Sequence, residues 1–364
     1  MFWTLFVILA LGAALLTAAA IAPLRAWLLR QAILDLPNDR SSHTVATPRG
    51  GGLAVVASIL AGGIVAIAAT GHGYAGDLDG LLMNGPLILL LTAALTLLSW
   101  IDDRAGLPAA PRLLAQGLAC AAGLLALPSG GVFQGLLPGW ADLALAWFVW
   151  LWFVNLYNFM DGIDGITAME TVTIAGGAVL MAALGATLLG PVILAGPFLT
   201  EGPRLLLILA AVAGAACGFL VWNRPPARIF LGDSGSVPLG FLLGWVLLLL
   251  AANGHWAAAL ILPLYHLADA SLTLGLRLLR GERIWQAHRQ HFYQQAARQF
   301  GSHGRVLARL LPLNLALVLL AALTIVWPAG SLPALAGAAV MVAATFWHFQ
   351  ERRPDAAVSG GSRS

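Results

Sequence analysis

The chain has 364 residues, of which 60% are hydrophobic and only 10% are charged, and its mean hydropathy is +0.86. A single soluble core cannot bury so much apolar surface, so the composition excludes an ordinary soluble protein and indicates a polytopic membrane protein. The net charge of +3 reflects membrane topology and contact with anionic lipids, and we expect no nucleic-acid partner.

Eleven apolar stretches follow one another along the chain, each close to the roughly 20 residues that a membrane-spanning helix needs. They cover residues 2–22, 51–70, 82–100, 112–128, 141–157, 166–188, 203–222, 236–252, 256–276, 307–327 and 330–349. We therefore predict an all-α polytopic integral membrane protein with about 11 transmembrane helices. Residues 1–350 are expected to form one transmembrane domain, and residues 351–364 a disordered cytoplasmic tail.

The first stretch ends in Thr17–Ala20, small residues that are typical of a signal-peptide cleavage site. No basic residue precedes the apolar run, however, whereas Arg25 and Arg30 follow it. This order favours an uncleaved anchor over a cleaved signal peptide.

The distribution of arginine predicts the orientation of the protein. All 19 basic residues are arginines. If the N-terminus is periplasmic, 18 of them fall in the inner loops and the C-terminal tail, and only Arg204 falls outside. Because cytoplasmic loops are rich in basic residues, we expect the C-terminus and the odd-numbered connections in the cytoplasm.

Polar segments are concentrated in those cytoplasmic connections. They are Leu36–Gly52, Asp102–Arg104, Asn158–Gly165, Asn223–Gly235 and His288–His291. Carboxylates at a membrane boundary are costly unless they are compensated, and a divalent cation with a phosphorylated substrate would compensate them. We therefore predict an active site for phosphate chemistry on the cytoplasmic face.

The two carboxylate motifs each have a structural and a functional interpretation. Asp102 and Asp103 can simply end a helix in water, or they can divide metal binding and substrate orientation between them. Asn158, Asp161 and Asp164 recur at every third position. On a helix this spacing leaves them within one broad face, where they can address one ligand.

Alternatives also remain for the next two segments. Asp233, Ser234 or Ser236 can cap the helix that follows, or Asp233 can bind Mg²⁺ beside amides and a positive helix end that suit a diphosphate. His288–His291 can belong to a basic amphipathic helix, or its two imidazoles and one guanidinium can bind phosphate.

Asp269 is a separate case, because it lies inside a predicted membrane helix. Buried acids in membranes usually pair with a cation or face a cavity. We expect Asp269 to pair with an arginine, with contact to a lipid phosphate as the alternative, and His266 to be its hydrogen-bonding neighbour.

In combination, these motifs resemble those of the polyprenyl-phosphate N-acetylhexosamine-1-phosphate transferases, glycosyltransferase family 4. The resemblance rests on Asp102-Asp103, Asn158-x-x-Asp161-Gly-x-Asp164-Gly165 and Gly232–Ser236, which occur in the family's order, and extends from Asp35 to Gln294. Thr47–Gly52 and Ala287–Gln294 are most similar to the bacterial branch that initiates O-antigen synthesis. The related phospho-N-acetylmuramoyl-pentapeptide transferase, the peptidoglycan translocase, has a triple-histidine run that is absent here.

The resemblance implies that residues 1–350 are a Mg²⁺-dependent phosphoglycosyltransferase domain of the bacterial inner membrane, with Mn²⁺ as an alternative ion. Such an enzyme transfers a UDP-activated N-acetylaminosugar-1-phosphate to undecaprenyl phosphate and releases UMP. The product, undecaprenyl-diphosphate-sugar, initiates O-antigen, lipopolysaccharide or other cell-envelope polysaccharide synthesis. The His-Arg motif favours a 6-deoxy donor such as N-acetylfucosamine or N-acetylquinovosamine over N-acetylglucosamine. Membrane lipids and a second copy in a homodimer are the other expected partners.

The resemblance also implies roles for individual residues. Asp233 is the expected main Mg²⁺ ligand, Asp103 supports the metal or the substrate, and Asp102 is the base toward the lipid phosphate. The expected residues at the diphosphate and sugar of the donor are Asn158, Asp161, His288, Arg289 and His291. Those expected at the uracil are Asp164, Asn223 and Phe230, with Phe230 stacking on the ring. His43, Arg49 and Arg112 are further expected substrate-binding residues.

Other mechanisms and functions stay open on the sequence alone. A direct displacement is favoured, since the lipid phosphate is already an anionic nucleophile, but a covalent aspartyl-phosphate route is the alternative. A multi-helix transporter or flippase would place polar groups near the bilayer midplane within inverted repeats, a pattern that the sequence does not suggest. A CDP-alcohol phosphotransferase would need an Asp-Gly-x-x-Ala-Arg motif, which is missing.

Overall fold

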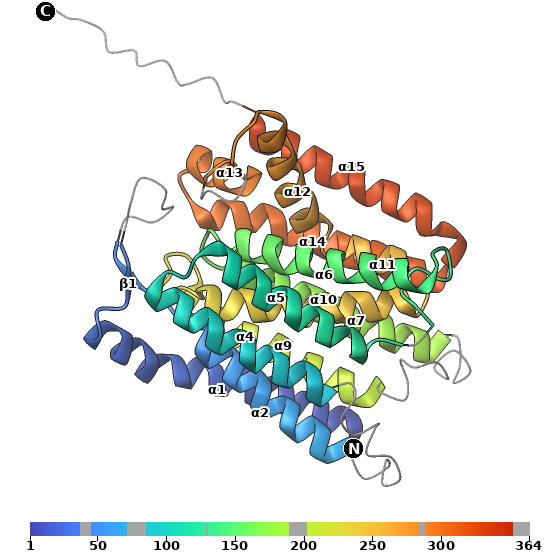
Figure 1. Ribbon diagram of the computed structural model, residues 1–364, viewed down its shortest axis with the longest axis horizontal. Helices are drawn as coiled ribbons and strands as arrows, with labels where there is room; N and C mark the ends of the chain where they lie inside the picture. The colour runs from blue at the N-terminus through green and yellow to red at the C-terminus, as the bar shows by residue number, and fades with distance from the viewer. Residues whose placement is uncertain (37–44, 71–84, 129, 189–201, 284–287, 352–364) are drawn as a thin grey trace, which may run out of the picture.

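The computed structural model describes residues 1–36, 45–70, 85–128, 130–188, 202–283 and 288–351 (Figure 1). In this part of the chain, ten helices are long and apolar enough to cross a membrane. They are α1 (Phe2–Arg30), α2 (Gly52–Thr70), α4 (Gly85–Ala105), α5 (Ala109–Gly123, continued by the 3₁₀ turn Leu124–Ala126), α6 (Gly139–Phe159), α7 (Ile166–Leu188), α9 (Gly202–Asn223), α10 (Asp233–Ala252), α14 (His303–Val326) and α15 (Ser331–Gln350, preceded by the 3₁₀ turn Pro328–Gly330). The prediction of an all-α polytopic membrane protein is confirmed.

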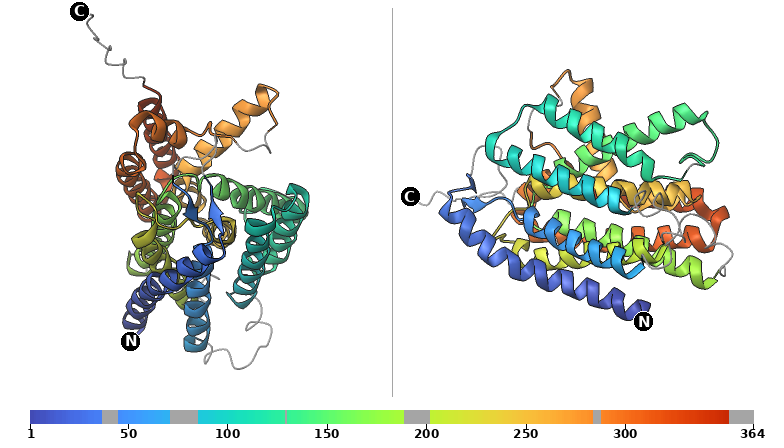
Figure 2. Two further views of the ribbon diagram at one scale, coloured as in Figure 1. Left: turned by 90° about the vertical axis from the view of Figure 1, so that its left-hand side faces the viewer. Right: turned by 60° about the horizontal axis from the view of Figure 1, so that its bottom comes forward.

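The predicted helix 256–276 is not continuous. It is divided into α11 (Trp256–Ile261) and α12 (Leu264–Leu279). Pro263 stands at the division, where its missing N–H and its ring disfavour a continuous helix. The ninth of the eleven predicted spans is therefore a broken helix, and α12 leans away from the bundle (Figure 2). A further short helix, α13 (Phe292–Phe300), follows it.

Helix α10 lies at the centre of the bundle, and most of its side chains are buried. It packs against α2, α4, α6, α7 and α11. Trp150 of α6 stacks on Phe241 of α10, with ring centroids 4.7 Å apart. The Trp150 indole N–H donates to the Phe241 carbonyl oxygen at 2.8 Å. Because hydrocarbon surrounds the bundle, such packing and hydrogen bonds, more than the hydrophobic effect, fix α10 against its neighbours.

One end of α10 is tied to the N-terminal part of the chain by backbone contacts. The strands β1 (Leu34–Asp35) and β2 (Thr47–Pro48) pair antiparallel, and Arg49 forms a bridge with Phe230. The N–H groups of Gly51 and Gly52 donate to the carbonyls of Phe230 and Leu231, each at 2.9 Å. These contacts set the start of α2 directly beside the start of α10.

Two glycines make this approach possible. A Cβ added to Gly52 would lie 2.2 Å from the backbone nitrogen of Gly235, and one added to Gly235 would lie 2.7 Å from the Cα of Gly52. Only a residue without a side chain fits at either position unless the two backbones move apart.

We predict that Gly52→Ala destabilises the protein by about 1–3 kcal/mol, the usual cost of overpacking. The measurement is the midpoint of thermal unfolding of purified protein in detergent. The matched control is Gly176→Ala in α7, where an added Cβ meets nothing within 4 Å. Equal midpoints for the two variants would contradict the prediction.

Candidate active site

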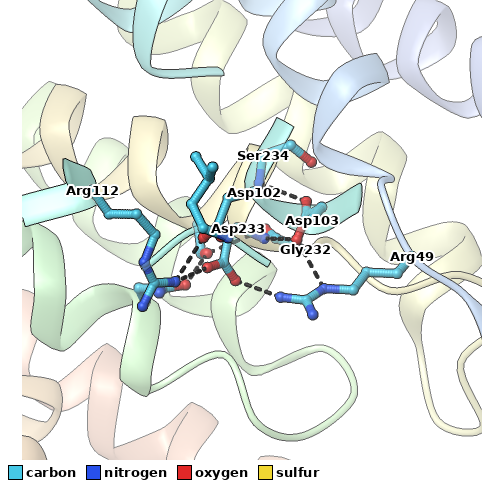
Figure 3. A network of polar contacts seen from close by, with 10 residues as sticks. Arg49, Asp102, Asp103, Arg112, Gly232, Asp233 and Ser234 are labelled. Carbon is cyan, nitrogen blue, oxygen red and sulfur yellow. Dashed lines mark hydrogen bonds and ion pairs between the residues drawn. The ribbon is translucent and has the colours of Figure 1, made fainter. Parts of the chain in front are cut away.

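Three aspartates and two arginines form one network at the start of α10 (Figure 3). Arg49 contacts Asp233 Oδ1 at 2.5 Å and Asp103 Oδ1 at 3.0 Å. Arg112 contacts Asp102 Oδ2 at 2.6 Å and Asp233 Oδ2 at 3.3 Å. We call these five residues the aspartate–arginine cluster. The structure thus brings together all three predicted catalytic residues.

Asp103 holds the start of α10 in place. Its carboxylate is completely buried and accepts hydrogen bonds from the backbone N–H groups of Asp233 and Ser234 at 3.1 and 3.0 Å. It therefore acts as a helix cap supplied by α4, a favourable use of a negative charge. Gly232 precedes the helix with φ +78°, and a Cβ there would lie 2.7 Å from Asp103 Oδ2. These contacts give Asp103 a positioning role.

Asp102 organises the turn between α4 and α5. Its Oδ1 accepts from the backbone N–H of Leu107 at 2.7 Å, while Oδ2 accepts from Arg112. Only 7% of its side chain is exposed, against 15% for Asp233. Asp102 is therefore fixed beside a guanidinium that it shares with Asp233.

Charge is nearly balanced within the cluster, because three carboxylates face two guanidiniums. Burial works against the charge of Arg49, but Asp233 and Asp103 more than offset this and raise its pKa. Arg49 hence stays charged, and the cluster carries a net charge of about −1 when all five groups are ionised.

The donor atoms are compatible with a magnesium ion at Asp233. Mg²⁺ is usually held by one or two carboxylates together with waters and substrate phosphates, so it needs no cage of protein ligands. No group of three metal-binding side chains occurs in the described residues. Asp233 is the most exposed of the three carboxylates, and its oxygens contact the guanidiniums of Arg49 and Arg112, whereas both oxygens of Asp103 also accept backbone N–H groups of α10. The geometry therefore favours Asp233 over Asp103 as a ligand.

The predicted segment Asn158–Gly165 lies against α10 and α7. Asn158 Oδ1 accepts from the Ser236 hydroxyl at 2.5 Å, and Asp161 Oδ1 accepts from the Thr167 hydroxyl at 2.5 Å. Burial raises the pKa of Asp161 to about 7, although the Thr167 bond and Arg49 act in the opposite direction. Asp161 is thus close to half-protonated at neutral pH in the free protein.

Asp164 and Asn223 join this segment to the loop between α9 and α10. Asp164 accepts from the backbone N–H of Ala227 at 3.0 Å and contacts His303 at 3.2 Å. Asn223 accepts from Gly165 N–H at 2.7 Å and donates to the Ile229 carbonyl at 2.9 Å. Both side chains therefore link separate loops into one wall.

That wall borders a cavity of about 580 Å³. Three predicted site residues line it, namely Asp164, Phe230 and Arg289. Val45, Thr47, Pro225, Pro226 and Ala227, from two segments that the sequence also singled out, line a further part, and residues that the sequence did not suggest line the rest: Ala297, Arg298, Gly301, Ser302 and His303. For Gly301, Ser302 and His303, the only local signal in the sequence was a serine directly before a helix. Ser302 caps α14 by accepting from Arg305 N–H.

The His-Arg motif leads into α13. The rings of His288 and His291 stack with centroids 4.7 Å apart. Burial, followed by His291 and Arg277, lowers the pKa of His288 to about 4, so His288 is neutral in the free protein. His291 contacts Asp269 Oδ1 at 3.1 Å. The motif is therefore anchored from α12, while Arg289 faces the cavity.

Two sequence predictions about buried residues are wrong. The described partners of Asp269 are His291, Tyr265, Thr273 and two backbone N–H groups, and none is an arginine. His266 lies 3.2 Å from Glu170 instead of pairing with Asp269. A helical pattern places residues on a face but does not identify which neighbouring helix covers it. His43, a predicted substrate-binding residue, lies outside the described residues.

A protein-family model matches the part of the chain that contains most of the aspartate–arginine cluster. The model described as Glycosyl transferase family 4 matches residues 86–251. Residues 86–251 are therefore similar to glycosyl transferase family 4. The match includes all three cluster aspartates and Arg112, whereas Arg49 and the His-Arg motif lie outside it.

We predict that Asp161 makes stability depend on pH. The folded protein retains a proton on Asp161 that the unfolded chain releases near its ordinary pKa of 3.8. This contribution is therefore lost as pH rises from about 4 through 7. As pH rises from 5 to 8 in the absence of divalent ions, the midpoint temperature of thermal unfolding should fall less steeply for Asp161→Asn than for the wild type. The exposed Glu351→Gln serves as control, and equal slopes for Asp161→Asn and the wild type would contradict the assignment.

Proposed function

We propose that this enzyme transfers an N-acetylaminosugar-1-phosphate from a UDP-sugar to undecaprenyl phosphate at the cytoplasmic face of the bacterial inner membrane. The product would start an O-antigen or related envelope polysaccharide. One observation carries the proposal: the same two chain segments contribute residues both to a nucleotide-sized cavity and to the aspartate–arginine cluster. Thr47 and Phe230 line the cavity, and Arg49 and Asp233 follow them within two and three residues in the cluster.

The cavity suits the nucleotide end of the donor. Phe230 supplies an aromatic face for a pyrimidine ring, and such stacking contributes about 1–3 kcal/mol per base. Asp164 supplies carboxylate oxygens, which accept hydrogen bonds from the N–H groups of a base. Arg289 and Arg298, also at the cavity, can bind phosphate oxygens. Base, ribose and phosphate can therefore lie in sequence from the cavity toward Asp233.

In the reaction, an oxygen of the acceptor phosphate forms a bond to the sugar-linked phosphorus while the bond to the bridging oxygen of UMP breaks. A phosphate monoester has a second pKa of about 6, so the acceptor is mostly dianionic and needs no strong base. Asp102 and Arg112 orient it, and Arg49 stabilises charge on the donor diphosphate. Mg²⁺ bound at Asp233 would neutralise the diphosphate and the departing UMP.

The transporter alternative is less consistent with the structure. Its substrate groups would lie near the bilayer midplane, whereas the cluster lies at the ends of α4 and α10 (Figure 3). A peptidoglycan translocase-type donor and a 6-deoxy N-acetylaminosugar donor both remain compatible with the cavity. The His-Arg motif favours the second, and a panel of UDP-sugars distinguishes them.

We predict that purified protein, given undecaprenyl phosphate and a panel of UDP-N-acetylaminosugars, releases UMP and forms a lipid-linked diphosphate-sugar. Chelation of divalent ions should abolish turnover, and added Mg²⁺ should restore it. Asp233→Asn should lower the rate by about 100-fold or more, as expected when charge stabilisation at the reacting phosphate is lost. Glu351→Gln is the control. Absence of UMP with every donor would reject the proposed function, and isolation of a phosphorylated enzyme would reject direct transfer.

We predict that Phe230→Leu raises the KM for the UDP-sugar by about tenfold or more, because base–aromatic stacking is lost. The KM for undecaprenyl phosphate should not change. Phe148→Leu, at an exposed aromatic position of α6, is the matched control. An equal rise in both KM values would show that the cavity does not hold the nucleotide.

A further inference from the structure

The carboxylate of Asp269 is unusually well supplied with donors for a group inside a membrane helix bundle. It is completely buried in α12. Oδ1 lies 3.1 Å from His291 Nδ1 and accepts from Phe292 N–H at 3.0 Å. Oδ2 accepts from Tyr293 N–H at 3.0 Å and from the Tyr265 hydroxyl at 3.1 Å.

These contacts give the Asp269 side chain two structural roles. Helix α13 begins after His291, which makes no capping hydrogen bond of its own. Asp269 supplies the missing acceptor to the first two N–H groups of α13, a position where a negative charge is favourable. The same carboxylate contacts the His291 ring, so the start of the helix and the orientation of the imidazole depend on one residue.

The contact also selects the tautomer of His291. An ionised carboxylate only accepts hydrogen bonds, so the ring nitrogen beside it must carry a proton. Nδ1 is therefore the protonated nitrogen. Stacking against His288, and against Tyr293 with centroids 5.6 Å apart, fixes the plane of the ring.

Tyr293 extends this support to the predicted donor-binding segment. Its hydroxyl donates to the Phe159 carbonyl at 3.0 Å. A Cβ added to Gly162 would lie 2.1 Å from the Tyr293 hydroxyl oxygen, so the tyrosine packs closely against the Asn158–Gly165 backbone. Asp269 thus supports the His-Arg motif and, through Tyr293, the segment that contains Asp161.

We propose that Asp269 is a positioning residue for donor binding: it accepts from His291 Nδ1–H and from the first N–H groups of α13, and so holds in place the His-Arg motif and α13, whose Arg289 and Arg298 line the cavity. The donor-binding part of this inference rests on the proposed function. The tautomer and the cap follow from the geometry alone and can be tested without substrate.

The substrate-free test is ¹⁵N NMR of the full-length protein labelled at histidine, in detergent, with His291 assigned by its loss in His291→Gln. The wild type should show His291 protonated at Nδ1. Asp269→Asn should shift His291 toward the Nε2–H form or a mixture. A wild-type His291 protonated only at Nε2 would overturn the inference, whatever the outcome of the transfer assay.

The kinetic test is a double-mutant cycle. Asp269→Asn should raise the KM for the UDP-sugar by about tenfold or more, the lower end of the range for losing a carboxylate that orients a metal-binding histidine, with a smaller change in kcat. In a His291→Gln background the same substitution should have little further effect, because the two residues act as one unit. Full additivity in the cycle would overturn the inference.

The matched control is Tyr265→Phe, which removes a hydroxyl from the same carboxylate without touching His291. It should lower thermal stability but leave the KM for the UDP-sugar within about twofold. If it raises KM as much as Asp269→Asn does, Asp269 has only a structural role. If Asp269→Asn does not fold, the ¹⁵N spectrum of the wild type still decides the matter, because a His291 protonated only at Nε2 overturns the inference and one protonated at Nδ1 supports it.

Discussion

The structure of the candidate active site depends on the buried carboxylate of Asp103. By accepting the N–H groups of Asp233 and Ser234, it joins the C-terminal end of α4 to the start of the central helix α10. By contacting Arg49, it adds the segment that precedes α2. Three parts of the chain that are far apart in sequence are thus held by one charge, which would be costly to bury without these partners.

Much of the fold was predictable from the sequence, because a membrane helix needs a long apolar run and nothing else in the chain produces one. The division between α11 and α12 was less visible, since Pro263 lies within a run that remains apolar on both sides. The short strands and α13 were missed because their stability comes from neighbours: β1 and β2 pair with each other, and α13 receives its cap from α12. Local pattern carries no information about such partners.

For the candidate site, too, the sequence pattern identifies residues but not the partners that they contact. Sequence reasoning found Asp102, Asp103 and Asp233, because acidic residues at helix ends are conspicuous in an apolar chain. The family resemblance suggested a different role for each of the three, but what each oxygen contacts is visible only in the fold. Sequence reasoning also missed His303 and Arg298, since a basic residue in an inner loop is expected from membrane topology alone. Only the fold shows that these two side chains face the cavity that Phe230 and Asp164 line.

The free site is already satisfied electrostatically, and this constrains how it can work. Asp233 is bonded to Arg49 at 2.5 Å and to Arg112 at 3.3 Å, so it cannot offer both oxygens to a cation while it keeps both arginines. A guanidinium released from Asp233 is at the same moment available to a phosphate oxygen. If Mg²⁺ binds at Asp233 as proposed, cation binding and donor binding would favour each other through the same two ion pairs, and by linkage the effect would be equal in both directions. Asp103 would then stay fixed by the backbone of α10 while Asp233 changed partners.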